Sequence, residues 1–162
     1  MTDTKLRKHL VQLLRGSDAH ISLQDALQDF PIDKAGIRPT GSPHSAWELL
    51  EHLRIAQEDI ALFSGVRGGG ERPEGYVELK FPDDLWPASP GPADEQAWLQ
   101  SVAAVERDLD EFIRFLEDPK HDLFTPFRWG DGQTLLREAL LIADHNAYHA
   151  GQLMLVRRML SE

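Results

Sequence analysis

The last continuous stretch of the chain, residues 135–160, constrains the fold more than any other segment. At about 100° per residue on a helix, one stripe of this stretch faces inward, formed by Leu135, Ala139, Ile142, Asn146, Ala150 and Leu153. Other apolar side chains fall outside that stripe, at Leu140, Leu141, Met154, Leu155 and Met159. Since a helix without a polar face is buried on more than one side, we expect other helices of a bundle, or a partner subunit, to cover it.

Two histidines, His145 and His149, lie four residues apart within this segment. On a helix they are neighbours on one face, near enough for both imidazoles to bind one metal ion. His149 falls inside the inward stripe and His145 on its margin. Such a pair also arises by chance, and a histidine can equally be a hydrogen-bonded core residue. The pair is therefore only half of a metal site.

A helix that begins at Ser42-Pro43 or at Ser45 and extends to residue 63 supplies a third histidine. Ser45-Ala-Trp-Glu48 has the pattern of a capping box at the start of a helix, and apolar residues follow at core-facing spacing. His52 lies on that apolar face, where its ring nitrogens need a backbone carbonyl, a carboxylate or a metal as partner. His44, at the start of the helix, is expected to face solvent.

Together, His52, His145 and His149 form a candidate set of three metal ligands drawn from two helices. Glu138 lies seven residues before His145 and Gln152 seven after it. Each could approach the site or orient a ligand nitrogen; the alternatives are an exposed glutamate and a glutamine that packs between helices. No general base is assigned.

Two further helices are predicted. Residues 4–15 are amphipathic and end at Gly16-Ser17-Asp18, after which Ser22 and Asp25 begin a short piece. Another long helix is predicted to begin at about Pro92 or Asp94 and to end at residues 117–119. Its solvated face is expected at Glu106, Asp108, Asp110 and Glu111. The Gly- and Pro-rich residues 65–94 form a long connection that lets this helix run parallel to the preceding one, as in bundles with a crossover.

Composition limits the other possibilities. A chain of 162 residues with 41% hydrophobic residues fits a single domain over residues 1–162. It has no cysteine, so any metal must be held by His, Asp or Glu. A formal net charge of −10 opposes binding to nucleic acid. No run of about 18 apolar residues and no apolar leader occurs, so we expect a soluble cytoplasmic protein without membrane partners.

Three motifs together resemble the DinB-like superfamily. They are His44-Ser-Ala-Trp-Glu-Leu-Leu-Glu-His52-Leu, Trp129-Gly-Asp-Gly-Gln-Thr-Leu-Leu-Arg-Glu-Ala and Asp144-His145-Asn-Ala-Tyr-His149-Ala-Gly-Gln152-Leu. The resemblance implies an all-α four-helix bundle with a long crossover between helices two and three, usually a homodimer. It also implies a divalent metal, typically zinc or nickel, bound by three histidines that match His52, His145 and His149.

Relatives implied by this resemblance include thiol-dependent S-transferases and metal-dependent hydrolases. Three imidazoles leave a coordination position open, where a metal activates water or a thiol. The first hypothesis is thus an enzyme that activates water or a low-molecular-weight thiol for attack on a small electrophile. The second is a non-enzymatic, stress-associated metal-binding bundle. A DNA-associated role is the third, which the net charge disfavours.

Overall fold

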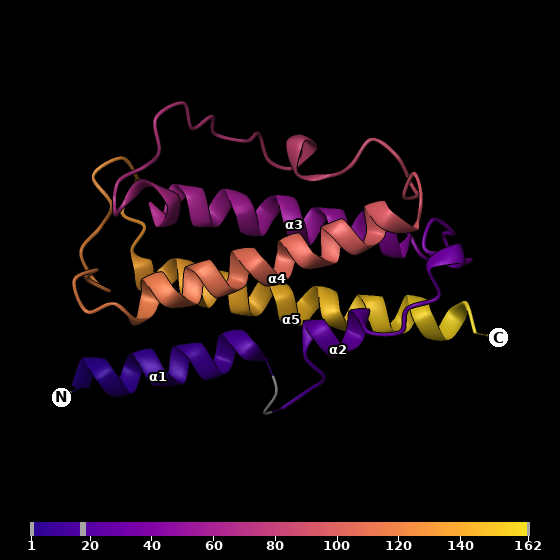
Figure 1. Cartoon of the computed structure of the whole chain (residues 1–162), viewed down its shortest axis with the longest axis horizontal. Helices are drawn as coiled ribbons and strands as arrows, with labels where there is room; N and C mark the ends of the chain where they lie inside the picture. Colours follow the sequence, from indigo (N-terminus) through magenta and orange to yellow (C-terminus); the bar gives the residue numbers. More distant parts are fainter. Residues whose placement is uncertain (1, 17–18, 162) are drawn as a thin grey trace.

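The computed structural model describes residues 2–16 and 19–161, which form five α-helices and three short 3-10 helices (Figure 1). In chain order these are α1 Thr2–Arg15, α2 Leu23–Leu27, η1 Ile32–Lys34, α3 Ala46–Phe63, η2 Val66–Gly68, η3 Asp83–Leu85, α4 Glu95–Glu117 and α5 Leu135–Met159. No strand occurs among the described residues. None of the described helices has the length and apolarity needed to cross a membrane.

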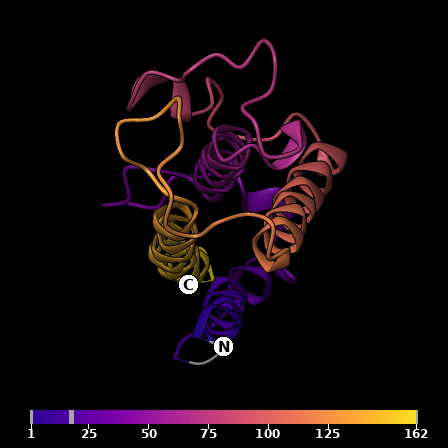
Figure 2. The same cartoon turned by 90° about the vertical axis from the view of Figure 1, so that its left-hand side faces the viewer.

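The four long helices form a bundle. Helix α3 packs against α4 and α5, and α1 packs against the same two helices from the other side. Figure 2 shows α4 and α5 on opposite sides of this arrangement. Helices α3 and α4 run in the same direction, so residues 64–94 cross back along the length of α3 (Figure 1). This confirms the predicted all-α four-helix bundle with a long crossover between its second and third long helices.

Local sequence sets the helix ends. The predicted capping box is present, because the Ser45 side chain accepts a hydrogen bond from the Glu48 N–H (3.1 Å) and the Glu48 carboxylate accepts one from the Ser45 N–H (2.8 Å). Thr134 caps the N-terminus of α5. Gly16, with φ of +68°, follows the end of α1. Ser17 and Asp18, assigned to the same break, lie outside the described residues.

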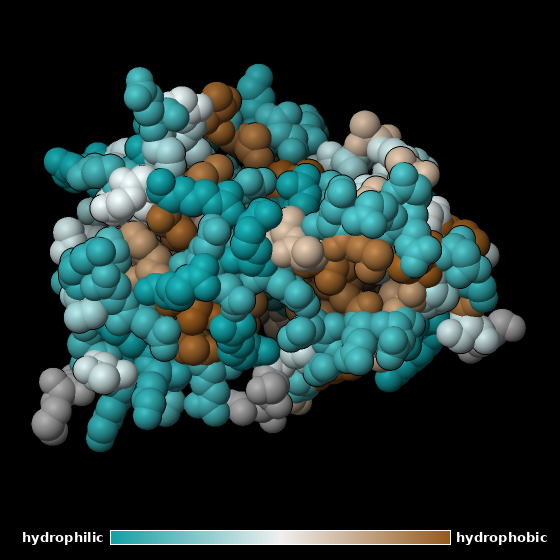
Figure 3. All heavy atoms as spheres, in the orientation of Figure 1, coloured by the Kyte–Doolittle hydropathy of each residue, from teal (hydrophilic) through white to brown (hydrophobic). Residues whose placement is uncertain are grey.

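Helix α5 is buried on its predicted inner stripe, where Leu135, Ile142 and Leu153 are at most 1% exposed. Its outer apolar residues behave differently, since Leu140 and Leu155 are 45% and 53% exposed. The other helices therefore cover only the inner side. Part of the outer apolar face of α5 is open to solvent in the single chain. Figure 3 shows the molecule from the side seen in Figure 1, where apolar and polar residues are interspersed.

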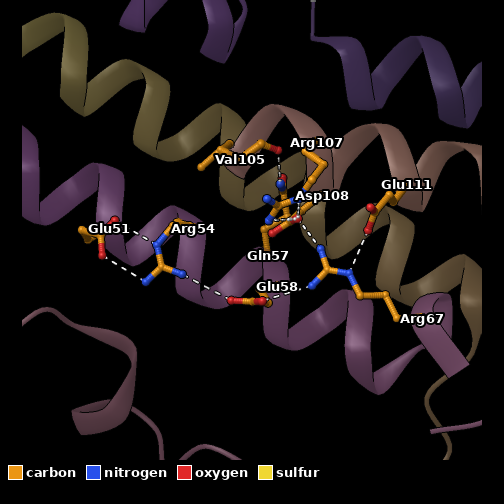
Figure 4. Close-up of polar contacts among 9 residues, drawn as sticks. All are labelled: Glu51, Arg54, Gln57, Glu58, Arg67, Val105, Arg107, Asp108 and Glu111. Atoms are coloured by element: carbon orange, nitrogen blue, oxygen red, sulfur yellow. Dashed lines mark hydrogen bonds and ion pairs between the residues drawn. The ribbon is translucent and has the colours of Figure 1, made fainter. Parts of the chain in front are cut away.

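The assignment of Asp108 to a solvated face is wrong, whereas Glu106 is exposed as predicted. Asp108 is 0% exposed and its carboxylate pairs with Arg67, from the loop after α3, and with Arg107 (2.8 Å) (Figure 4). Arg67 also binds Glu58 (3.1 Å) and Glu111 (2.8 Å). A buried carboxylate needs cationic partners to remain charged. This network ties the end of α3 to α4, a long-range contact that sequence periodicity does not reveal.

Candidate metal centre

The bundle brings His52 of α3 together with His145 and His149 of α5. One ligand nitrogen from each ring can be chosen so that all three lie within 4.8 Å of one another. The ring centroids are separated by 4.8 Å (His52–His145), 4.7 Å (His52–His149) and 4.5 Å (His145–His149). The two helices thus place three imidazoles around one point, as expected from the shared face of the His145–His149 pair.

Hydrogen bonds at Nδ1 orient two of the three rings. His52 Nδ1 lies 2.8 Å from the carbonyl oxygen of Leu85, and His149 Nδ1 lies 2.6 Å from Gln152 Oε1. Both partners are oxygen acceptors, so each Nδ1 carries the proton and each Nε2 carries a lone pair. Metal-binding histidines commonly donate their second N–H in this way. Gln152 therefore orients a ring, one of the two alternatives the sequence left open.

His145 and His52 face each other through Nε2 atoms that are 2.9 Å apart. Because His52 Nε2 has only a lone pair, His145 Nε2–H is the donor when no metal is bound. Binding of a cation between the rings would replace that proton. The short separation is thus compatible with either a hydrogen bond or a shared metal ion.

Burial keeps all three rings neutral near pH 7. It lowers the pKa of His145 to about 3, with the neighbouring His149 and His52 adding to the effect. It lowers the pKa of His149 to about 4, again with a contribution from His52. The pKa of His52 is also lowered by burial, against the opposing hydrogen bond to Leu85. Neutral imidazoles are the protonation state that a metal ion requires.

The crossover segment packs against His52. Trp86 stacks on the His52 ring at a centroid distance of 4.0 Å and an interplanar angle of 3°. The other face of Trp86 stacks on His44, also at 4.0 Å. His44 is therefore half-buried rather than facing solvent as expected, because an indole ring covers it. The tryptophan separates His44 from the three-histidine cluster.

A cavity of about 610 Å³ opens beside the three histidines, between α3, α5 and the crossover segment. Its wall includes the apolar side chains of Ala56, Ile60, Leu85 and Leu141. Its polar residues other than the three histidines are His44, Asp59, Arg137, Tyr148 and Gln152. A cavity of this size and lining suits a small-molecule ligand.

The two acidic residues of α5 near the histidines, Glu138 and Asp144, lie outside the cavity lining. Glu138, for which exposure was one alternative, is only 2% exposed and pairs with Arg137 (2.7 Å). It is not among the residues that line the cavity, and Asp144 is exposed. Sequence reasoning did not find Leu85, Trp86 or Asp59. Leu85 acts through its backbone carbonyl, which no side-chain pattern indicates, and the only signal for Trp86 was an aromatic residue within a long loop.

The protein is an all-α bundle in which three neutral imidazoles are positioned to hold a metal ion. These imidazoles lie in the wall of a cavity whose size suits a small molecule. The family model of the DinB superfamily matches residues 18–153, which is most of the chain. The chain belongs to the DinB superfamily, and the resemblance found in the sequence is confirmed. Neither a curated protein nor a solved structure shows a significant match to it.

Proposed function

We propose that His52, His145 and His149 bind one divalent ion, zinc or nickel, and that the protein is an enzyme acting on a small electrophile. The convergence of three imidazoles beside a cavity of about 610 Å³ is the observation that carries this proposal. Imidazole nitrogen suits both metals. Three protein ligands leave a coordination position open, as catalytic sites do and closed structural sites do not.

The residues present fit such an ion. Each ring is neutral, and the Nδ1 protons of His52 and His149 are held by Leu85 and Gln152, which leaves their Nε2 atoms unprotonated. An ion would take the place of the His145 proton that the His52 Nε2 lone pair accepts. No carboxylate joins the three histidines in the cluster among the described residues. The ion would therefore keep its full positive charge.

When bound, such an ion lowers the pKa of a thiol or of water enough to supply a nucleophile at neutral pH. The apolar cavity walls limit the water around the reacting groups, and Trp86 fixes the plane of the His52 ring. Because the chain contains no cysteine, a thiol nucleophile would come from a low-molecular-weight thiol. The proposed reaction is therefore S-transfer from such a thiol, or hydrolysis.

The test measures turnover of a panel of small electrophiles with water alone or with an added thiol. The protein is loaded with zinc or nickel, or treated with chelator. We expect turnover that needs metal and is lost in His52→Ala, while His20→Ala, which changes an exposed histidine, retains it. Stoichiometric metal without turnover across the panel would instead support the non-enzymatic metal-binding bundle.

We also propose that the protein forms a homodimer through the outer face of α5. Leu140, Leu155 and Met159 are 45%, 53% and 40% exposed on this helix, and large apolar surfaces of this kind commonly mark interfaces. Light scattering should give twice the chain mass for the native protein. Leu155→Glu should give the single-chain mass, and a native monomer would contradict the proposal.

A further inference from the structure

The cavity carries a second chemical feature, the carboxylate of Asp59. Asp59 follows His52 by two turns of α3, about 10 Å along the helix axis, and lines the same cavity. Ala56 and Leu141 contribute apolar wall to this cavity. The cavity therefore has two polar ends, the three histidines and Asp59.

Asp59 lacks a cationic partner. Its Oδ1 accepts a hydrogen bond from the Tyr76 hydroxyl (2.8 Å), while no Lys, Arg or His nitrogen lies within 4.0 Å of it among the residues that the structure describes. Burial raises the pKa of Asp59, the hydrogen bond from Tyr76 opposes this, and the charge of Glu78 adds to it. A partly buried carboxylate without an ion pair is costly, and a bound cation would offset that cost.

The other charged group on the cavity wall is Arg137, and it already has a partner. Its guanidinium donates to the carboxylate of Glu138 at 2.7 Å, and Glu138 is 2% exposed. The charge of Arg137 is thus balanced by a neighbour on its own helix. The charge left unbalanced at this end of the cavity is the negative charge of Asp59, with Glu78 close enough to reinforce it.

We infer that the ligand of this cavity carries an ammonium group, and that Asp59 binds it at the end remote from the three histidines. An ammonium group supplies the charge and the N–H donors that the Asp59 carboxylate lacks, and charge-assisted hydrogen bonds of this kind are stronger than neutral ones. The inference rests on the proposed function only for the other end of the ligand, the thiol or electrophile that meets the metal. Asp59 is thus a specificity-determining residue.

The first experiment needs no metal. Chelator-treated protein is titrated with hexylammonium and with hexanol, which share an apolar chain and differ in the end group, and binding is followed by NMR chemical shifts. We expect hexylammonium to bind about tenfold more tightly than hexanol, from one charge-assisted hydrogen bond. Asp59→Asn should abolish this preference and leave hexanol binding in place, whereas Asp33→Asn, the same change at an exposed site away from the cavity, should leave both unchanged.

The second experiment adds the metal. Cobalt-loaded protein is titrated with aminohexanethiol, hydroxyhexanethiol and mercaptohexanoate, and sulfur-to-cobalt absorption reports thiolate binding. The ammonium-terminated thiol should bind most tightly, in an Asp59-dependent manner.

Several results would overturn the inference. These are equal affinities for the ammonium and neutral ligands, no detectable binding of hexylammonium, or an ammonium preference that survives in Asp59→Asn. A preference for mercaptohexanoate would assign this end of the cavity to Arg137 and overturn it as well. An Asp59-dependent preference in the chelated protein, combined with failure to bind cobalt, would leave this inference standing and remove the proposed metal function.

Discussion

Replacing Gln152 by leucine is expected to weaken metal binding without unfolding the bundle. Gln152 Oε1 accepts the Nδ1 proton of His149 at 2.6 Å, and His149 is 5% exposed. A leucine removes the acceptor and leaves a buried N–H without a partner, which costs about 1–3 kcal/mol of folding free energy. The metal affinity should fall by roughly 10- to 100-fold, because the ring and its tautomer are no longer held in the orientation that binds the ion.

The assay is competition for zinc between the protein and a chromophoric chelator, with circular dichroism as a check on folding. Three variants serve as comparisons. Gln152→Glu keeps an acceptor and should bind zinc at least as tightly as the native protein. Tyr148→Phe removes only a hydroxyl that Gln152 contacts at 3.3 Å, and Gln100→Leu changes an exposed glutamine on α4, so both should match the native protein. Native affinity in Gln152→Leu would refute the argument that this hydrogen bond orients a metal ligand.

Three other outcomes are expected. His149→Ala should lose bound metal by elemental analysis while circular dichroism shows nearly unchanged helicity, because most of the other buried side chains of α5 are apolar. Unchanged stoichiometric metal would refute its assignment as a ligand. Arg67→Ala should lower the free energy of unfolding by about 2 kcal/mol in a denaturant titration, whereas Arg114→Ala, at an exposed site, should not change it. This loss is smaller than the roughly 3–5 kcal/mol for breaking a fully buried pair, because Arg67 is part-exposed and Arg107 still pairs with Asp108. Burial raises the pKa of Glu138, so its contribution to stability is fully present below the unfolded-state pKa and is lost as the pH rises through the folded-state pKa. Glu138→Gln should reduce this loss when the free energy of unfolding is measured from acidic to neutral pH. Parallel curves of unfolding free energy against pH for the variant and the native protein would contradict the prediction.

The long helices were predictable because local signals agreed with one another. The Ser45 and Glu48 side chains marked the start of α3, and the residues of the predicted inner stripe of α5 recur at helical spacing. The crossover was predictable because residues 65–94 form a long connection, rich in turn residues and without helical periodicity. Asp108 was misassigned for a physical reason. A helical pattern places charged residues outside, and only the arginine of a distant loop makes burial of this carboxylate tolerable.

The three histidines were predictable from helix geometry, whereas their orientation was only partly so. His145 and His149 share a face because they are four residues apart, and His52 lies on the apolar face of its own helix. Gln152 could be named because it is on the same helix as His149. The hydrogen-bond partner of His52 could not be predicted, since the acceptor is the backbone carbonyl of Leu85 within an irregular segment. Asp59 likewise reads as an ordinary polar residue until the crossover covers it and Tyr76 reaches its carboxylate.

The two oriented rings therefore depend on different parts of the chain. His149 is held by a residue of its own helix, so this hydrogen bond keeps its ring in place as long as α5 is intact. His52 is held by the crossover segment, through the Leu85 carbonyl on one nitrogen and the Trp86 ring on one face. That segment also forms part of the cavity wall. A displacement of residues 85 and 86 would release His52 and change the cavity at the same time, so the three-histidine cluster and the cavity are coupled through this one stretch of backbone.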